Sequence, residues 1–358
     1  MFYHFLYPLN EFFGGFNVVK YITFRTFAAL LTAMLFYLVC GKPWIRFLKN
    51  RQMAQTIRMD GPQAHLGKKG TPTMGGLLLI VSVLFSVFLW GNWGSDYLGV
   101  SLYVFVGMGA IGFVDDYKKV MKRDTKGFAG RYKIILEVFI CLSAALFIYG
   151  YKGLDTRLYV PFLKQVQPDL SFWYLFLTIF VVVGAANAVN LTDGLDGLAA
   201  VPSMTAFLTY GFLVYVVGHV VISNYLQIPF VKESGELAVL CGAVVGACIG
   251  FLWFNAYPAE IFMGDVGALG LGGLLGFVAL IAKQEILLVL VGGLFVMETL
   301  SVITQVISFK LTGKRIFRMA PLHHHFELKG WSEPKIIVRF WILSFVLALL
   351  SLATLKLR

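Results

Sequence analysis

The chain has 358 residues, of which 58% are hydrophobic and only 14% are charged. Soluble domains carry roughly 25% charged residues, so this composition excludes an ordinary soluble protein and indicates one that crosses a membrane many times. The formal net charge of +11 would favour nucleic-acid binding in a soluble domain. The basic residues lie between apolar runs, however, where they report membrane topology, so no nucleic-acid partner is expected.

The first 20 residues are rich in aromatic residues and glycine but lack a basic stretch and a small-residue cleavage site. No cleavable signal peptide is therefore expected, and the segment suits the membrane interface. A helix that spans a bilayer needs about 20 mostly apolar residues. We therefore expect an all-α polytopic membrane protein, a single domain over 1–358, with about ten transmembrane helices, the ninth tilted or bent because its run is long. The apolar runs lie at approximately 22–41, 74–91, 97–114, 132–150, 172–190, 198–219, 236–254, 265–282, 285–308 and 337–355.

Small residues within these runs fit a structural role. Glycine recurs every four residues in the seventh run, at Gly242, Gly246 and Gly250, which predicts close packing against another helix. The cysteines lie in apolar runs without CxxC spacing, so neither a zinc cluster nor a disulfide framework is expected. They are Cys40, Cys141, Cys241 and Cys248.

The connections between the predicted helices differ in charge. Most of the 30 Lys and Arg residues lie in the connections 42–73, 115–133 and 309–339. The positive-inside rule makes their side cytoplasmic, and ten spans then place both termini on the periplasmic side. Two more connections on the cytoplasmic side, 190–197 and 255–264, contain no Lys or Arg but carry Asn and Asp.

The motif GFVDDYKK at 112–119 ends the third run with Asp115 and Asp116. Carboxylates at a membrane edge are costly and usually functional. The alternative is a solvated helix end whose charge is screened by the lysines that follow. This motif alone leaves both interpretations open.

The motif NAVNLTDGLDGL at 187–198 is more specific. Asn187 and Asn190 share a helix face because they are three residues apart, and Asp193 and Asp196 lie in glycine turns. Helix caps explain one aspartate, but they do not explain two asparagines within an apolar run. This motif therefore predicts a functional site.

The motif WFNAYPAEIFMGDVGALG at 253–270 supplies Asn255 and Asp265. Asp265 opens an apolar run, so a helix N-cap is the alternative role. Together, the cytoplasmic motifs collect aspartates, asparagines and lysines in a cleft that faces the cytoplasm. Oxygen ligands of this kind suit Mg²⁺, which usually binds one or two carboxylates plus substrate phosphates. These groups indicate phosphoryl transfer.

The motif APLHHHFELKGW at 320–331 holds His323, His324 and His325. On a regular helix they would point about 100° apart, so they reach one ligand only where the backbone is irregular. No further soft ligands accompany them, so hydrogen bonding to a pyrophosphate is favoured over zinc.

The chain resembles, from end to end, the bacterial phospho-N-acetylmuramoyl-pentapeptide transferases, the translocase I family of peptidoglycan synthesis. The aspartate motifs are similar to those of the wider polyprenyl-phosphate sugar-1-phosphate transferases, whereas the histidine motif resembles the muramoyl-pentapeptide branch alone. The motifs that carry the resemblance are those above together with GTPTMGG at 70–76 and DTKG at 124–127.

The resemblance implies a reaction in which UDP-N-acetylmuramoyl-pentapeptide and undecaprenyl phosphate give lipid I and UMP, with Mg²⁺ as cofactor. It also implies a homodimer in the bacterial inner membrane with its site on the cytoplasmic side. Asp265 is the implied Mg²⁺ ligand, with Asp115 and Asp116 as further candidates beside the attacking phosphate, and Lys133 is implied to hold phosphate. The implied substrate-binding residues are Lys68, Thr73, Asn187, Asn190, Asp193, Asp196, Asn255, Phe262, Gln305, His323, His324 and His325.

Two other functions fit part of the pattern. A sister transferase would use another UDP-N-acetylhexosamine, although the histidine motif disfavours it. A transporter of lipid-linked substrates would also carry intramembrane polar groups, but its site would lie near the midplane. The sequence leaves open whether attack is direct or passes through an aspartyl intermediate, and which of Asp115 and Asp116 does what.

Overall fold

The computed structural model describes all residues except 54–69, 123–126, 162, 164–165 and 357–358. The described part is helical, and an isolated bridge between Arg157 and Asp169 is its one extended pairing. Nine of its helices are long and apolar enough to cross a membrane. They are α2 (Ile22–Asn50), α4 (Asp96–Lys122), α5 (Gly130–Ala145, continued by the π-helical turn η4, Leu146–Tyr151), α6 (Trp173–Thr192), α7 (Ala200–Val217), α9 (Leu237–Asn255, preceded by η5, Ser234–Glu236), α10 (Gly264–Ile281), α12 (Gly293–Thr312) and α14 (Glu333–Ala353).

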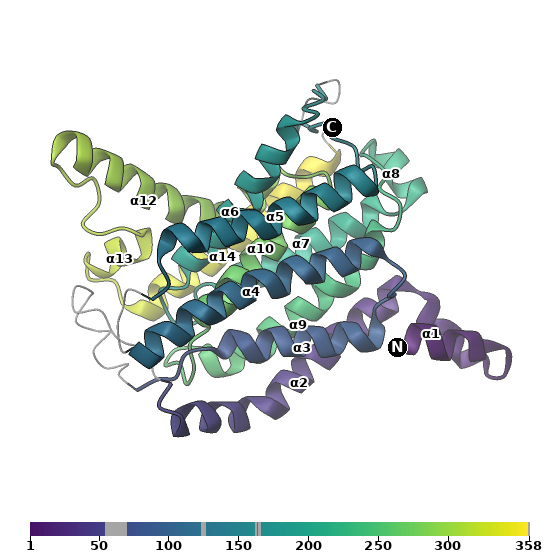
Figure 1. Ribbon diagram of the computed structural model, residues 1–358, viewed down its shortest axis with the longest axis horizontal. Coiled ribbons are helices and arrows are strands. Elements are labelled where there is room, and N and C mark those ends of the chain that lie inside the picture. The colour runs from purple at the N-terminus through teal and green to yellow at the C-terminus, as the bar shows by residue number, and fades with distance from the viewer. Residues whose placement is uncertain (54–69, 123–126, 162, 164–165, 357–358) are drawn as a thin grey trace.

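The second predicted run, 74–91, forms the shorter apolar helix α3 (Gly75–Trp90). Each predicted run therefore contains a helix, which confirms the all-α polytopic class. The ninth run is broken at Gly292 into α11 (Leu288–Val291) and α12, and α12 stands away from the bundle in Figure 1. The remaining short helices are α1 (Phe2–Leu6), η1 (Tyr7–Glu11), η2 (Gly14–Lys20), α8 (Val220–Leu226), α13 (Leu322–Glu327) and η6 (Thr354–Lys356).

Helices α9 and α10 form the centre of the bundle, and nearly all of their side chains are buried. The predicted close packing of the α9 glycines is confirmed. A Cβ at Gly242, Gly246 or Gly250 would meet the backbone of α2, at Thr26, Leu30 and Met34 respectively. Glycine thus lets the two helix backbones touch, as small residues do in membrane proteins.

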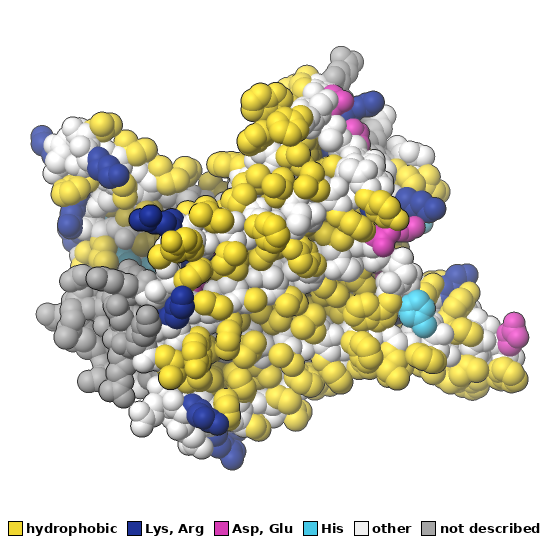
Figure 2. All heavy atoms as spheres, viewed as in Figure 1, with side chains coloured by type: hydrophobic (Ala, Val, Ile, Leu, Met, Phe, Trp, Pro, Cys, Tyr) yellow, Lys and Arg dark blue, Asp and Glu magenta, His cyan; other side chains and the backbone are white. Residues whose placement is uncertain are grey.

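The polar connections meet at one end of the bundle, although they are far apart in sequence. There, Gly75 N donates to Phe262 O, and Gly197 N donates to the side chain of Asn255. Figure 2 shows yellow apolar side chains along the flank, with Lys and Arg at the end that carries α12 and α13. The helices therefore bring the predicted motifs to one end of the molecule.

Candidate active site

Two carboxylates and two lysines from three helices form the centre of the site. Lys119, one turn after Asp115 on α4, places Nζ 2.7 Å from Asp115 Oδ2 and 3.0 Å from Asp265 Oδ2. Lys133, in the first turn of α5, places Nζ 3.0 Å from Asp265 Oδ2 and 3.8 Å from Asp115 Oδ2. The lysines thus join helices α4, α5 and α10 through shared carboxylate oxygens.

Asp265 is not the N-cap of α10, because it lies within the first turn and its carboxylate binds the lysines. Asp116 lies beside the same turn and accepts a 3.2 Å hydrogen bond from Val266 N. Gly264 separates Asp116 from Thr73: it has φ +75°, and a Cβ there would meet side-chain oxygens of both residues. Glycine therefore allows this turn to pack against the Asp116 carboxylate and the buried Thr73 hydroxyl.

The C-terminal end of α6 brings two polar side chains, Asn190 in its last turn and Asp193 just after it, to this end of the bundle. Within the described residues, Nδ2 of Asn190 is buried without a hydrogen-bond partner, and no hydrogen bond contributes to the shifted pKa of Asp193. Burial raises the pKa of Asp193 to about 8, and the charges of Asp265, Asp116 and Asp196 act in the same direction. Groups without protein partners are suited to bind a substrate.

Other predicted binding residues hold the connections together. Asn255 accepts from Gly197 N and donates to Ile261 O, both at 2.8 Å, so it ties the loop after α6 to the loop after α9. Asp196 joins the same two loops by accepting a 3.0 Å hydrogen bond from Ala259 N. Phe262 forms backbone hydrogen bonds to Pro72 and Gly75.

Asn187 donates to a buried carboxylate that sequence reasoning missed. Its Nδ2 lies 2.7 Å from Oε2 of Glu137 on α5. The side chain of Glu137 is fully buried, and its Oε1 has no hydrogen-bond partner in the described part of the chain. Glu137 lies one turn after Lys133, and a lone carboxylate in an apolar run was the available signal.

The three histidines have different surroundings. His323 is 1% exposed and places Nδ1 3.2 Å from Oε1 of Glu298 on α12, itself 0% exposed. A Cβ at Gly194 would collide with Nε2 of His323, so this imidazole packs against the loop that carries Asp193. Glu298, a second carboxylate missed in the sequence, thus lies at the junction of α12, α13 and this loop.

His324 and His325 lie nearer the surface than His323. His324 Nδ1 pairs with Glu327 Oε2 at 2.6 Å, and His325 Nδ1 accepts from Arg318 N at 3.1 Å. Gln305 on α12 holds the connection between α12 and α13. Its side chain accepts hydrogen bonds from Ile316 N and Phe317 N and donates one to Phe317 O. Its amide is therefore used within the protein. Lys68 lies outside the described residues.

The donor set at the centre fits a hard cation. Asp115 Oδ2 and Asp265 Oδ2 converge on one ammonium group, that of Lys119, so carboxylates from two helices already face a common positive charge. No group of three or more His, Cys, Asp or Glu side chains with metal-binding geometry occurs among the described residues. Two carboxylates are nevertheless what Mg²⁺ commonly takes from a protein, with phosphate and water completing the shell.

Comparison with known families assigns this fold and site to a class of enzyme. The model described as glycosyl transferase family 4 matches residues 97–283. This range carries the central carboxylates and lysines together with the Asn190–Asp196 loop. The molecule is thus a multi-pass membrane transferase of this class.

The branch within the class follows from closer relatives. Residues 68–80 match the phospho-N-acetylmuramoyl-pentapeptide-transferase signature 1. Proteins described by that name from Syntrophus aciditrophicus, Pelobacter propionicus and Thermodesulfovibrio yellowstonii are 56%, 55% and 55% identical to the chain, each over 100% of both chains. The chain belongs to the phospho-N-acetylmuramoyl-pentapeptide-transferase family, which confirms the resemblance seen in its motifs.

Proposed function

We propose that this protein transfers phospho-N-acetylmuramoyl-pentapeptide from its UDP donor to undecaprenyl phosphate, giving lipid I and UMP. The observation that carries the proposal is the Asp115–Lys119–Lys133–Asp265 cluster at the basic end of a membrane bundle. An oxygen of the lipid phosphate attacks the phosphorus attached to the sugar, and the pyrophosphate bond to UMP breaks. Both reactants are anions, so their approach requires positive charge at the site.

The lysines supply part of that charge. Lys119 and Lys133 would bind phosphate oxygens, and Asp265 with Asp115 would hold Mg²⁺. When bound, Mg²⁺ would neutralise the pyrophosphate and stabilise the leaving UMP. Positioning and charge stabilisation then lower the barrier with little covalent chemistry from the protein. Asp115 or Asp116 would accept the proton if the lipid phosphate arrives protonated.

The binding residues divide by their hydrogen bonds. Among the described residues, Nδ2 of Asn190 has no hydrogen-bond partner and no hydrogen bond contributes to the shifted pKa of Asp193, so we assign both to the nucleotide-sugar, together with Thr73, Lys68 and Phe262. By contrast, Asn187, Asp196, Asn255 and Gln305 have hydrogen-bond partners in the protein and would shape the pocket. His323 lies 3.2 Å from Glu298, although neither ring nitrogen has a hydrogen-bond partner among the described residues, and it would position the loop that carries Asp193. His324 and His325 would face the pyrophosphate or sugar.

We also propose the setting of the reaction. The chain would act as one integral domain over 1–358 in the bacterial inner membrane, with the carboxylate end cytoplasmic, the termini periplasmic, and the active unit a homodimer. The basic connections support this orientation. Labelling of cysteines introduced at each end of the bundle in intact cells would test it, and light scattering of the detergent complex would test the dimer.

The deciding experiment measures UMP release by purified protein supplied with both substrates and either Mg²⁺ or a chelator. We expect release only with Mg²⁺ and both substrates. Asp265→Asn should reduce turnover by at least about 10³-fold, the scale on which loss of one essential electrostatic group acts. The matched control is Asp96→Asn, at the other end of α4, where Asp96 pairs with Lys152. Near-normal turnover of Asp265→Asn would refute the assignment, and release with another UDP-N-acetylhexosamine alone would refute the donor.

A further inference from the structure

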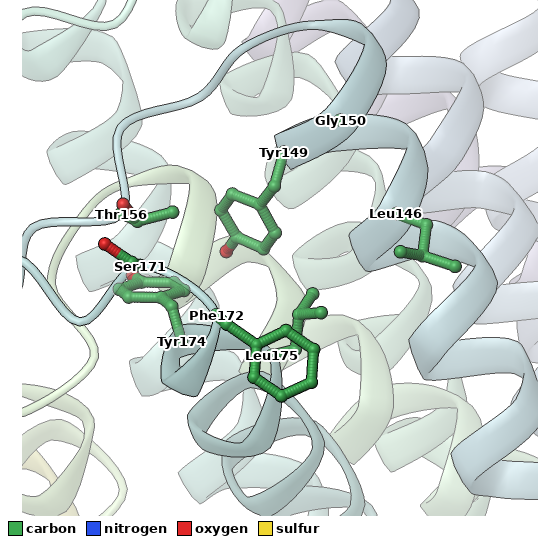
Figure 3. A pocket seen from close by; sticks show the side chains of 8 residues that line it. All are labelled: Leu146, Tyr149, Gly150, Thr156, Ser171, Phe172, Tyr174 and Leu175. Carbon is green, nitrogen blue, oxygen red and sulfur yellow. The ribbon is translucent and has the colours of Figure 1, made fainter.

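A cavity of about 240 Å³ lies at the opposite end of α5 and α6 from the carboxylates (Figure 3). Leu146, Tyr149 and Gly150 line it from η4, and Phe172, Tyr174 and Leu175 line it from the start of α6. Leu146 is 54% exposed and Phe172 is 66% exposed, so the cavity opens on the flank that faces lipid. It is separate from the proposed active site, which uses the other ends of these helices.

The lining limits what the cavity can hold. Most of the side chains are apolar or aromatic, and apolar cavities of about 150 Å³ already bind small hydrocarbons. Binding sites for drug-sized ligands begin at about 300 Å³, so a nucleotide-sugar is too large. Tyr151 and Trp173, each next in sequence to a lining residue, are exposed, and such aromatic residues are enriched at membrane interfaces. A hydrocarbon chain that enters from the bilayer fits this position.

The loop above the cavity carries charges of both signs. Thr156 and Ser171 border the cavity, and next to them Arg157 bridges to Asp169 along the backbone. Arg157 Nε lies 3.8 Å from Asp155 Oδ1, and these charged side chains are exposed. Both carboxylates also accept hydrogen bonds within the loop, Asp155 from Tyr159 and Asp169 from Thr156 and Ser171. One guanidinium beside two exposed carboxylates matches a head group that contains both a phosphate and an ammonium better than a purely anionic one.

We propose that this cavity binds one acyl chain of a zwitterionic phospholipid from the leaflet opposite the active site. The lipid phosphate would lie at Arg157 and its ammonium at Asp155 and Asp169. The local backbone supports a built site. The α5 helix ends in the π-helical turn η4, a feature frequent at functional sites.

The test is native mass spectrometry of the detergent-purified full chain. After delipidation, the protein receives either phosphatidylethanolamine or phosphatidylglycerol. We expect one phosphatidylethanolamine per chain to survive activation that strips the other lipids, and we expect phosphatidylglycerol to be lost. Leu146→Trp and Gly150→Phe should fill the cavity and abolish retention. A Cβ at Gly150 meets no atom within 4 Å, so the larger side chain begins without a backbone clash.

Gly99→Phe is the matched control, because Gly99 is an exposed α4 glycine whose added Cβ also meets nothing within 4 Å. It should retain the lipid as the wild type does. Arg157→Gln alters only an exposed side chain, and it should weaken retention even if both cavity-filling variants misfold. Equal retention by the wild type, both filling variants and Arg157→Gln would overturn the proposal. Retention of phosphatidylglycerol equal to that of phosphatidylethanolamine, or no retention by the wild type, would overturn it as well.

Discussion

Gly112 lies where α4 packs against α10 beside the proposed active site. The variant Gly112→Ala therefore tests whether catalysis depends on this helix contact. Gly112 lies on α4, one turn before Asp116, against the first turn of α10. An added Cβ would lie 2.6 Å from Val266 N and closer still to the carbonyl group of Asp265, whereas ordinary contacts begin at 3.4 Å. Because these neighbours are backbone atoms, they cannot rotate away. The helices must separate locally by about 1 Å. Overpacking of this kind lowers the free energy of unfolding by about 1–3 kcal/mol.

That displacement acts on the residues proposed to hold Mg²⁺ and phosphate. The 3.0 Å contact from Lys119 to Asp265 and the 3.2 Å bond from Val266 to Asp116 both cross the α4–α10 pair. Movement of Asp265 also alters its 3.0 Å contact with Lys133 on α5. A misplacement of about 1 Å lowers enzymatic rates by about 10²-fold. We therefore expect Gly112→Ala to lower kcat for UMP release by about 10²-fold. The protein should still fold, with its thermal midpoint lowered only as far as an overpacking cost of about 1–3 kcal/mol requires.

The control is Gly99→Ala on the same helix, where the added Cβ meets no atom within 4 Å. It introduces the same methyl group without touching α10, so its kcat should equal that of the wild type. The assay is initial-rate UMP release at saturating substrates, with thermal unfolding in detergent recorded in parallel. If Gly112→Ala folds and turns over at the wild-type rate, precise α4–α10 contact is not needed for catalysis, and the reasoning fails.

Three further predictions concern charges away from the central cluster. Because burial raises the pKa of Asp193 to about 8, its carboxyl is mostly neutral below that pH and ionises above it. Calorimetric titration of the nucleotide donor should therefore show weaker binding as pH rises through 8, and Asp193→Asn should remove this pH dependence. Glu298→Gln keeps the side-chain shape but removes the charge beside His323, so donor KM should rise more than kcat falls; unchanged donor KM would argue against a positioning role. Arg25→Met leaves Glu236 buried without its bidentate partner at 2.6 and 2.8 Å, which should cost about 3–5 kcal/mol in unfolding measurements, and Arg25→Met/Glu236→Leu should recover most of it.

The helices were predictable because the bilayer imposes one length and one composition on each span. The basic connections predicted that the polar motifs lie at one end of the bundle. The four-residue spacing of the α9 glycines predicted their packing role. The position of the break at Gly292 could not be predicted from the sequence. The run 285–308 is continuous in apolar character, and only the structure shows that α11 and α12 are separate helices.

Hydrogen-bond partners were the part of the site that the sequence could not supply. Glu137 and Glu298 lie in apolar runs, and the side chains that face them come from other elements: Asn187 donates a hydrogen bond to Glu137, and His323 lies 3.2 Å from Glu298. No helical spacing connects such residues, because the pairing distance of three or four residues operates only within one helix. Lys119 is the contrasting case, since its four-residue spacing from Asp115 was visible in the sequence and the structure shows the pair at 2.7 Å.

This difference explains why Asn187 and Asn190, equivalent in the motif, have different roles in our proposal. They share one face of α6, as their spacing predicted. Glu137 accepts a hydrogen bond from the amide of Asn187, whereas Nδ2 of Asn190 is buried without a partner in the part of the chain that the structure describes. An unpaired buried amide costs about 1–3 kcal/mol, so a substrate that hydrogen-bonds to it recovers that free energy. Replacing Asn190 with Leu should therefore weaken donor binding while leaving the stability of the free protein unchanged or raised, by up to about 1–3 kcal/mol. Replacing Asn187 with Leu should lower stability, because it removes the hydrogen-bond partner of the buried Glu137 carboxylate.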